Sequence, residues 1–182
     1  MRSLTAVLSY RPGSFFEKTL LSLTKSSLVE SVVVVCPKPI PLKGDGFRVL
    51  PAGPFPSGET INLILAEIRT KYLLLFPGSE PISLEPQALE RVVGTAESKE
   101  AGIVYCDLYD GGELGKTLHP LNDYQAGSVR DDFEFGSMIL FSTDAVRKSL
   151  EKYGPVPAVK SAGLYDLRLK VSIDHSVHHL RE

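Results

Sequence analysis

A chain of 182 residues is long enough to bury the core of one domain and short for two. Its hydrophobic fraction of 43% and charged fraction of 23% are ordinary for a globular protein, and its formal net charge of −2 provides no broad positive field for nucleic acid or anionic lipid. We therefore expect a single domain over residues 1–182 that has no nucleic-acid partner.

The longest apolar runs, residues 32–36 and 72–76, have the length of strands and fall far below the roughly 20 residues that cross a bilayer. The N-terminal run at 4–8 is interrupted by a polar residue and lacks the apolar centre of a signal peptide. These features predict a cytoplasmic protein with no transmembrane segment. Cys36 and Cys106 each end an apolar run, and we expect both to be buried free thiols.

The first fifty residues alternate between strand-like and helix-like patterns, which is typical of a parallel sheet covered by helices. Residues 4–10 and 31–36 predict strands, the second being a β-branched run expected of a strand buried on both faces. Between them, Ser14 can cap a helix that has Glu17 three residues further on. The stripe of that helix that should face the sheet is Phe15, Phe16, Thr19, Leu20 and Leu23.

The alternation continues through the middle of the chain. Residues 47–52 predict a third strand, and a loop rich in Pro and Gly follows it. The helix after this loop has apolar residues at positions 61, 64, 65 and 68, one face of an α-helix. Residues 72–76 are the most strand-like segment of the chain, and Pro77 and Gly78 stop it.

A third helix is predicted from the apolar stripe between positions 89 and 96, with Ser83 as a candidate cap. Residues 103–108 return to a strand. The segment 109–133 is rich in Gly, Asp, Asn and His, too polar and aperiodic for a covered element. This composition leaves two interpretations open, a functional loop or a peripheral hairpin.

The last third of the chain predicts a short strand at 138–141 and a helix that Thr143 can cap and that Gly154 ends. After it, residues 165–171 favour a helix and 173–180 an extended segment. His175, His178 and His179 do not predict a metal site, because adjacent residues of a strand point to opposite faces and no Cys or paired carboxylate completes a zinc set.

This order of elements resembles family-two glycosyltransferases of the GT-A fold over nearly the whole chain. The opening LTAVLSYRPGSFFEKTLLSL is similar to that family's first strand, nucleotide-base loop and first helix. The stretch SGETINLILAEIRTKYLLLFPGSEPISLEPQALERVV resembles its Asn-containing helix, the next strand, the metal-binding turn and the start of the following helix. LYDLRLKVS resembles the helix that carries or follows the catalytic base. The resemblance implies an α/β, GT-A (Rossmann-like) fold, a mostly parallel sheet flanked by helices.

The resemblance also implies a set of site residues. The base loop would hold Ser9, Tyr10 and Arg11, and Asn62 would be the helix asparagine, all four on the nucleotide. Asp107 would contact the donor sugar or a metal at the end of its strand; the alternative is an ordinary turn carboxylate. Asp166 is the first candidate for the general base; the alternative is an exposed helix charge. Likewise, we expect Tyr10, the bend at 76–80 and Asp107 to meet in one cleft.

The metal-binding turn departs from the family. Where the family has an Asp-x-Asp turn, this chain has Pro77, Gly78 and Ser79, and Glu80 is the one carboxylate left. Ser79 and Glu80 could hold Mg²⁺ or Mn²⁺ together with waters and phosphates, or the turn has lost its metal and Glu80 is solvated. A metal-independent enzyme would need cationic donors on the diphosphate. Candidates for that role are Arg11, Lys38 and Arg130.

From this resemblance we expect a transferase that moves a sugar from a nucleotide-diphosphate donor to a glycan acceptor in bacterial cell-surface polysaccharide synthesis. One alternative is a GT-A domain that has lost turnover and serves as a nucleotide- or glycan-binding or assembly module. Another is a different doubly wound nucleotide-binding enzyme. A homodimer is a further possibility that the sequence leaves open.

Overall fold

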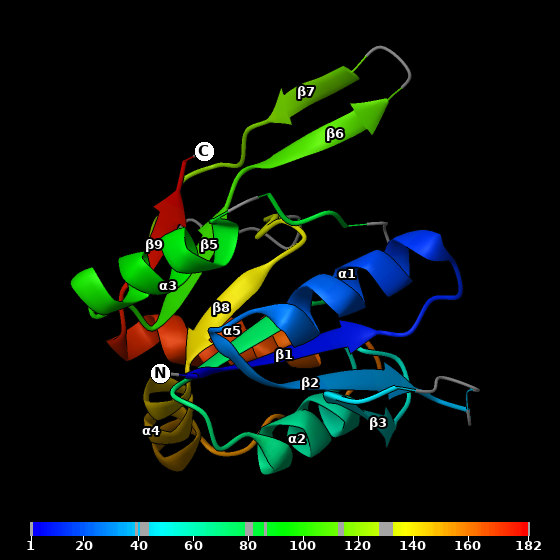
Figure 1. The fold of residues 1–182 in the computed structure, drawn as a ribbon. Coiled ribbons are helices and arrows are strands. Elements are labelled where there is room, and N and C mark those ends of the chain that lie inside the picture. Colours follow the sequence, from blue (N-terminus) through cyan, green and yellow to red (C-terminus); the bar gives the residue numbers. More distant parts are fainter. Residues whose placement is uncertain are drawn as a thin grey trace.

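The structure is a computed structural model, which describes residues 2–38, 40, 44–78, 82–85, 87–112, 115–127 and 133–181. A seven-stranded sheet forms its middle (Figure 1). In spatial order its strands are β3 (Phe47–Pro51), β2 (Val29–Cys36), β1 (Leu4–Ser9), β4 (Tyr72–Phe76), β8 (Ile139–Ser142), β5 (Ile103–Cys106) and β9 (Val177–Leu180).

Within this sheet β8 alone is antiparallel to its neighbours, and the other pairs are parallel. The carboxyl ends of β1, β4 and β5 therefore share one edge of the sheet, where β8 begins. The sequence prediction of a mostly parallel, helix-flanked α/β fold is confirmed.

Helices cover both faces of the sheet (Figure 1). On one face, α1 (Ser14–Lys25) and α3 (Ala88–Ser98) pack in one apolar cluster; on the other, α2 (Gly58–Glu67), α4 (Thr143–Tyr153) and α5 (Gly163–Asp174) pack in a second. Strand β4 contacts both clusters: Leu74 belongs to the first, and Leu73 and Leu75 belong to the second. This explains why its sequence is apolar throughout. A strand covered on both faces buries every side chain.

The segment after β5 folds as a hairpin, one of the two interpretations that its composition left open. Strands β6 (Leu108–Gly112) and β7 (Gly115–His119) form an antiparallel pair separate from the main sheet. The pair projects from the rest of the protein (Figure 1).

The beginning of α1 differs from the sequence prediction. Ser14 is the first residue of the helix and not its cap; Gly13 holds the cap position and provides no side-chain hydrogen bond. Gly13 has φ 142° and ψ 162°, a conformation that is essentially confined to glycine. The chain turns sharply here, between the end of β1 and the first turn of α1.

Two further capping predictions are also wrong. Ser142, one residue before the predicted Thr143, caps α4 by accepting a hydrogen bond from the Ala145 N–H. Ser83 does not cap α3, whose first turn is preceded by Gln87 in the left-handed conformation. The periodic apolar pattern locates a helix well but locates its first residue poorly. Adjacent hydroxyl residues such as Ser142 and Thr143 are both suitable caps, and the apolar pattern does not distinguish between them.

Helices α2 and α5 begin against each other. The Gly58 N–H donates to the Val159 carbonyl at 2.9 Å, and the Gly163 N–H donates to the Pro56 carbonyl at 2.8 Å. A Cβ atom on Gly163 would lie 2.5 Å from the Gly58 nitrogen, and one on Gly58 would lie 1.8 Å from the Pro157 carbonyl oxygen. The approach of α2 to the segment 157–159 therefore requires glycine at position 58, and the approach of α5 to α2 requires glycine at position 163.

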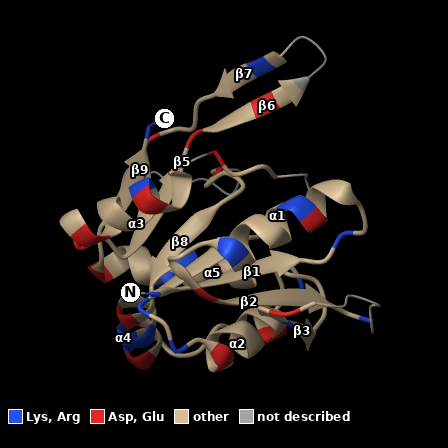
Figure 2. Ribbon diagram, viewed as in Figure 1, with Lys and Arg blue, Asp and Glu red and all other residues tan. Residues whose placement is uncertain are grey.

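Charged residues of both signs are interspersed over the helices (Figure 2). Both cysteines are free thiols, as the sequence predicts; Cys36 is buried as expected, whereas Cys106 is only partly buried. Burial raises the pKa of the Cys106 thiol to about 11, so this thiol stays protonated at neutral pH. In the described part of the chain, none of the helices has the length and apolarity needed to span a bilayer.

Candidate functional site

The strand order reverses direction between β1 and β4. From β1 the chain builds outward through β2 to β3, and then returns to place β4 on the opposite side of β1. In open α/β sheets the helices leave a crevice at such a point, beyond the carboxyl ends of the strands, and ligands bind there. The topology therefore indicates where a ligand site belongs before any side chain is considered.

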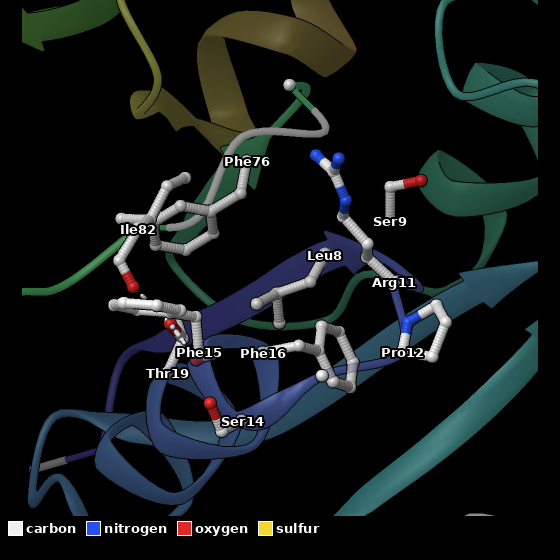
Figure 3. Close-up of a pocket in the computed structure, with 12 residues that line it drawn as sticks. Leu8, Ser9, Arg11, Pro12, Ser14, Phe15, Phe16, Thr19, Phe76 and Ile82 are labelled. Atoms are coloured by element: carbon white, nitrogen blue, oxygen red, sulfur yellow. Dashed lines mark hydrogen bonds between the residues drawn. The ribbon is translucent and has the colours of Figure 1, made fainter.

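A cavity lies at this place (Figure 3). Leu8 and Ser9 at the end of β1, Phe76 at the end of β4 and the first turns of α1 line it. The space within it that water-sized molecules can occupy is about 230 Å³. This is below the range of about 300–1,000 Å³ that is usual for pockets enclosing a whole small molecule, so part of a bound nucleotide would lie outside the cavity.

The wall of the cavity formed by α1 is aromatic. Phe15 and Phe16 both line it, and the Phe15 side chain is 55% exposed. The Tyr10 ring packs edge-on against the Phe16 ring, with 5.3 Å between centroids. An exposed phenylalanine in a concave site offers a flat apolar face on which a nucleobase can stack.

Arg11 adds a positive charge to this cavity, whose α1 wall is otherwise aromatic. Its side chain extends between Ser9 and Phe76 (Figure 3), and no carboxylate is among the described residues that line the cavity. The first N–H groups of α1, which have no acceptor within the helix, lie beside the same cavity. A guanidinium next to a helix N-terminus favours an anionic ligand such as a phosphate.

Thr19 connects the two walls. This side chain is 3% exposed, and its hydroxyl lies within hydrogen-bond distance of the Phe15 carbonyl at 3.0 Å and of the Ile82 carbonyl. Ile82 follows the bend after β4 and lines the cavity. Thr19 therefore ties α1 to the segment on the far side of the cavity and sets the separation of its walls.

Neither a protein-family model nor a curated protein sequence matches this chain. Solved structures do. The 4-diphosphocytidyl-2C-methyl-D-erythritol synthase of Anaerococcus prevotii matches with a TM-score of 0.61 and 12% identity, over 99% of this chain and 87% of the synthase. CMP:2-keto-3-deoxy-manno-octonic acid synthetase, solved in complex with CTP, matches with a TM-score of 0.58 and 10% identity, over 99% and 90%.

TarS of S. aureus, residues 1–349, matches with a TM-score of 0.65 and 13% identity, over 99% of this chain and 58% of that one. Identities this low show the fold alone. The chain has a GT-A-like, Rossmann-like fold that it shares with nucleotide-binding transferases. The resemblance in the sequence predicted this fold.

The structure brings together only some of the residues that the sequence nominated. Ser9 and Arg11 line the cavity, and Tyr10 supports its wall through Phe16. Asn62 does not line it; its side-chain amide donates to the Val156 carbonyl at 2.8 Å and so fastens α2 to the segment after α4. Ser79 and Glu80, on which the metal prediction rested, lie outside the described residues, as does Arg130.

Asp166 lies in the first turn of α5 and does not line the cavity. Its carboxylate forms an ion pair with Lys170 one turn further along, at 2.7 Å, and the Lys170 ammonium also donates to the Pro155 carbonyl. This arrangement places Asp166 beside the loop after α4. Within the described residues, no group of three His, Cys, Asp or Glu side chains is arranged to hold a metal ion.

Asp107 follows β5 at the expected sheet edge, but its carboxylate is engaged elsewhere. Its side chain is 5% exposed, and Oδ1 accepts a hydrogen bond from the Leu121 N–H at 2.8 Å and contacts Nε2 of His179 at 2.7 Å. Of the three segments that we expected in one cleft, the ends of β1 and β4 meet in the cavity. Asp107 does not line it.

His179 joins two carboxylates. Its ring stacks on Tyr105, with centroids 4.7 Å apart, and its Nδ1 contacts Asp123 Oδ1 at 2.8 Å while Nε2 contacts Asp107. An imidazolium provides an N–H to each carboxylate, whereas a neutral ring provides only one. The network fixes β9 to the end of β5 and to the segment after the hairpin.

This network predicts an acid-sensitive contribution to stability. The hydrogen bond with His179, followed by that with Arg181, holds the pKa of Asp123 below its usual value. A depressed folded-state pKa stabilises the protein above the unfolded pKa of about 4, and this stabilisation is lost as the pH falls through the folded pKa. We predict that Asp123→Asn flattens the fall in Tm between about pH 5 and pH 2. Thermal unfolding in a pH series checks this, and parallel curves for parent and variant would contradict it.

Phe15, Phe16 and Thr19 line the cavity, a role that sequence reasoning missed. All three were assigned to the stripe that packs on the sheet; Thr19 is buried and Phe16 packs against the apolar cluster on that face. The position of Phe15 could have indicated this role. Phe15 lies in the first turn of α1, close after the end of β1, where the sheet need not cover an apolar side chain.

Proposed function

We propose that this chain binds a nucleoside diphosphate sugar in the cavity at the ends of β1 and β4 and transfers the sugar to a glycan acceptor. The observation that carries the proposal is the coincidence of this cavity with the switch point of the sheet. The GT-A-like fold agrees with it. The acceptor belongs to bacterial cell-surface polysaccharide synthesis in this proposal, on the basis of the family resemblance.

In this proposal, different cavity residues bind the base and the diphosphate of the ligand. Phe15 stacks the nucleobase, with Tyr10 and Phe16 behind it, and Arg11 and the first N–H groups of α1 neutralise the diphosphate. Neutralising the leaving diphosphate lowers the barrier to transfer, because charge builds up there as the bond to the sugar breaks. A Mg²⁺ or Mn²⁺ ion held by Ser79 and Glu80 would add further positive charge to the phosphates.

Asp166 is the proposed general base for the acceptor, and Asp107 is the proposed contact of the donor sugar. For Asp166 to act, its carboxylate must exchange Lys170 for the acceptor hydroxyl. Asp107 remains a donor contact only if the sugar approaches the buried His179 network. Both roles require the substrate to reorganise contacts that the structure shows.

The second candidate function is a domain that binds a nucleotide or glycan without turnover. Two observations favour it: Pro77 and Gly78 stand in the turn where the resemblance expects carboxylates, and Asp166 is paired with Lys170. Such a module would keep the cavity and lose the chemistry.

Calorimetric titration with UDP, GDP and CTP, each with and without Mn²⁺, tests the binding step. Binding of a nucleoside diphosphate supports the proposal, and stronger binding with Mn²⁺ supports the metal at Ser79 and Glu80. Preference for CTP would instead indicate a nucleotidyltransferase. If none of the three binds under either condition, the donor site is wrong.

Hydrolysis of the sugar nucleotide that binds best then tests catalysis. We expect Asp166→Asn to lower the hydrolysis rate by about 10²- to 10⁴-fold if Asp166 is the base. Lys170→Met is the matched control, because it breaks the same ion pair and leaves the carboxylate in place. Donor binding without any turnover in the parent would favour the binding module.

A further inference from the structure

Thr19 carries a hydroxyl group that lies between two acceptors. The residue is 3% exposed and lies one turn after Phe15 on α1. Its Oγ1 is 3.0 Å from the Phe15 carbonyl oxygen and also contacts the carbonyl oxygen of Ile82. A hydroxyl has one hydrogen, so Thr19 can make a well-aligned hydrogen bond to only one of these oxygens at a time.

The two carbonyls differ in their need for that hydrogen. Phe15 lies inside α1, where its carbonyl accepts from the backbone N–H four residues further on. Ile82 lies outside the helices and strands, where side chains commonly provide the donors for backbone groups. A carbonyl that is removed from water without a donor is costly. The hydrogen therefore stabilises the structure more when it is donated to Ile82 than when it is donated to Phe15.

The hydrogen bond between Thr19 and Ile82 joins two sides of the cavity. Phe15 and Thr19 line the cavity from α1, and Ile82 lines it from the segment after β4 (Figure 3). Ile82 and Phe16 also pack against the same apolar cluster, which brings the two segments together. Apolar packing has no preferred direction, whereas a hydrogen bond has a narrow range of length and angle. The hydrogen bond therefore determines how far Ile82 lies from α1.

We propose that Thr19 is a positioning residue of the donor site. Its hydroxyl holds Ile82 at a fixed distance from α1, so that the space beside Phe15 has its shape before a ligand arrives. This inference rests on the proposed function, which places the nucleoside in this cavity. A preformed site binds more tightly than a loose one, because less conformational entropy is lost on binding. Thr19 thus acts on affinity through Ile82 and not through its own contact with the nucleotide.

Nucleotide affinity in variants of Thr19 tests this role. Thr19→Val keeps nearly the same shape and removes the hydroxyl. It should weaken binding of the best ligand among UDP, GDP and CTP by about five- to tenfold. Thr19→Ser keeps the hydroxyl and loses a methyl group, so it should bind within about twofold of the parent. Calorimetric titration of the three proteins gives these affinities.

Thermal stability separates positioning from a purely structural role. Thr19→Ser loses a buried methyl group and should have a lower Tm than the parent, although it binds the nucleotide. If Thr19 acted through stability alone, affinity would fall together with Tm in both variants. Affinity that follows the hydroxyl, whatever the Tm, supports the proposal. Equal losses of affinity in Thr19→Val and Thr19→Ser, or an unchanged affinity in Thr19→Val, would overturn it.

Thr24 offers a matched control on the same helix. Its hydroxyl also contacts a carbonyl of α1, that of Leu21 at 3.1 Å, but Thr24 does not line the cavity. Thr24→Val should therefore bind the nucleotide as the parent does. A loss as large as that in Thr19→Val would mean that removing any hydroxyl from α1 has this effect, which would contradict the assignment.

The NMR signal of the Ile82 carbonyl carbon, measured without nucleotide, separates this inference from the proposed function. Thr19→Val should shift this signal, whereas Thr19→Ser and Thr24→Val should leave it close to that of the parent. An unmoved signal in Thr19→Val refutes the inference, whatever the protein binds. A shifted signal in a protein that binds no nucleotide refutes the proposed function and leaves the link between α1 and Ile82 standing. Nucleotide binding that is equal in the parent and Thr19→Val refutes the inference alone.

Discussion

Replacing Arg11 by methionine is expected to weaken the binding of a nucleoside diphosphate by about 10- to 100-fold. Arg11 is the charged residue among the described ones that line the cavity, and methionine keeps most of its length while removing the charge and the N–H donors. Calorimetric titration of the parent and the variant with the same nucleotide measures the change. The loss should grow smaller as salt is added, because the contact lies near solvent.

The matched control is Lys25→Met, which removes the same charge from the opposite end of α1. It should leave the affinity within about twofold of the parent, since screening by salt water limits the reach of an exposed charge to roughly 10 Å. Equal losses in the two variants would mean that net charge, and not the position of Arg11, governs binding. Unchanged affinity in Arg11→Met would place the diphosphate elsewhere.

The second large effect concerns stability. Gly58→Ala and Gly163→Ala should each lower the free energy of unfolding by about 3 kcal/mol or more, because the new methyl group meets backbone atoms that cannot rotate away. Denaturant unfolding measured by circular dichroism gives both values. The double variant should cost less than the sum of the two single ones, since one shift of the start of α2 away from both the segment 157–159 and α5 relieves both clashes.

Gly94→Ala in α3 is the comparison. A Cβ atom there meets nothing within 4 Å, and the residue lies within a helix. It should therefore raise the free energy of unfolding by about 0.5–1 kcal/mol. A similar loss at all three glycines would show that these close backbone contacts are not what makes Gly58 and Gly163 necessary.

The regular part of the fold could be predicted from the sequence because it depends on local periodicity. Strand β4 was predicted with the bounds that the structure shows, since a buried five-residue run followed by Pro77 and Gly78 has few alternatives. The spatial order of strands is less accessible. The insertion of β8 between β4 and β5 depends on contacts between residues far apart in the chain, which periodicity does not report.

The site could be predicted only where the sheet edge determines it. Ser9 and Arg11 follow β1 directly, so their place beside the switch point follows from the topology. Asp107 also follows its strand directly, but its surroundings depend on His179, 72 residues further on. Asn62 is similar, because its partner at Val156 belongs to a segment whose position only the folded structure determines.

The late position of β8 and β9 in the chain has a consequence for biosynthesis. Strands β1 to β4 can pair with one another as soon as residues 4–76 have emerged from the ribosome. The apolar β5 finds its partners in residues 139–142 and 177–180, so it remains an open template until those later residues have emerged. An unpaired apolar strand is prone to self-association, and slowing elongation after β5 would lengthen its exposure.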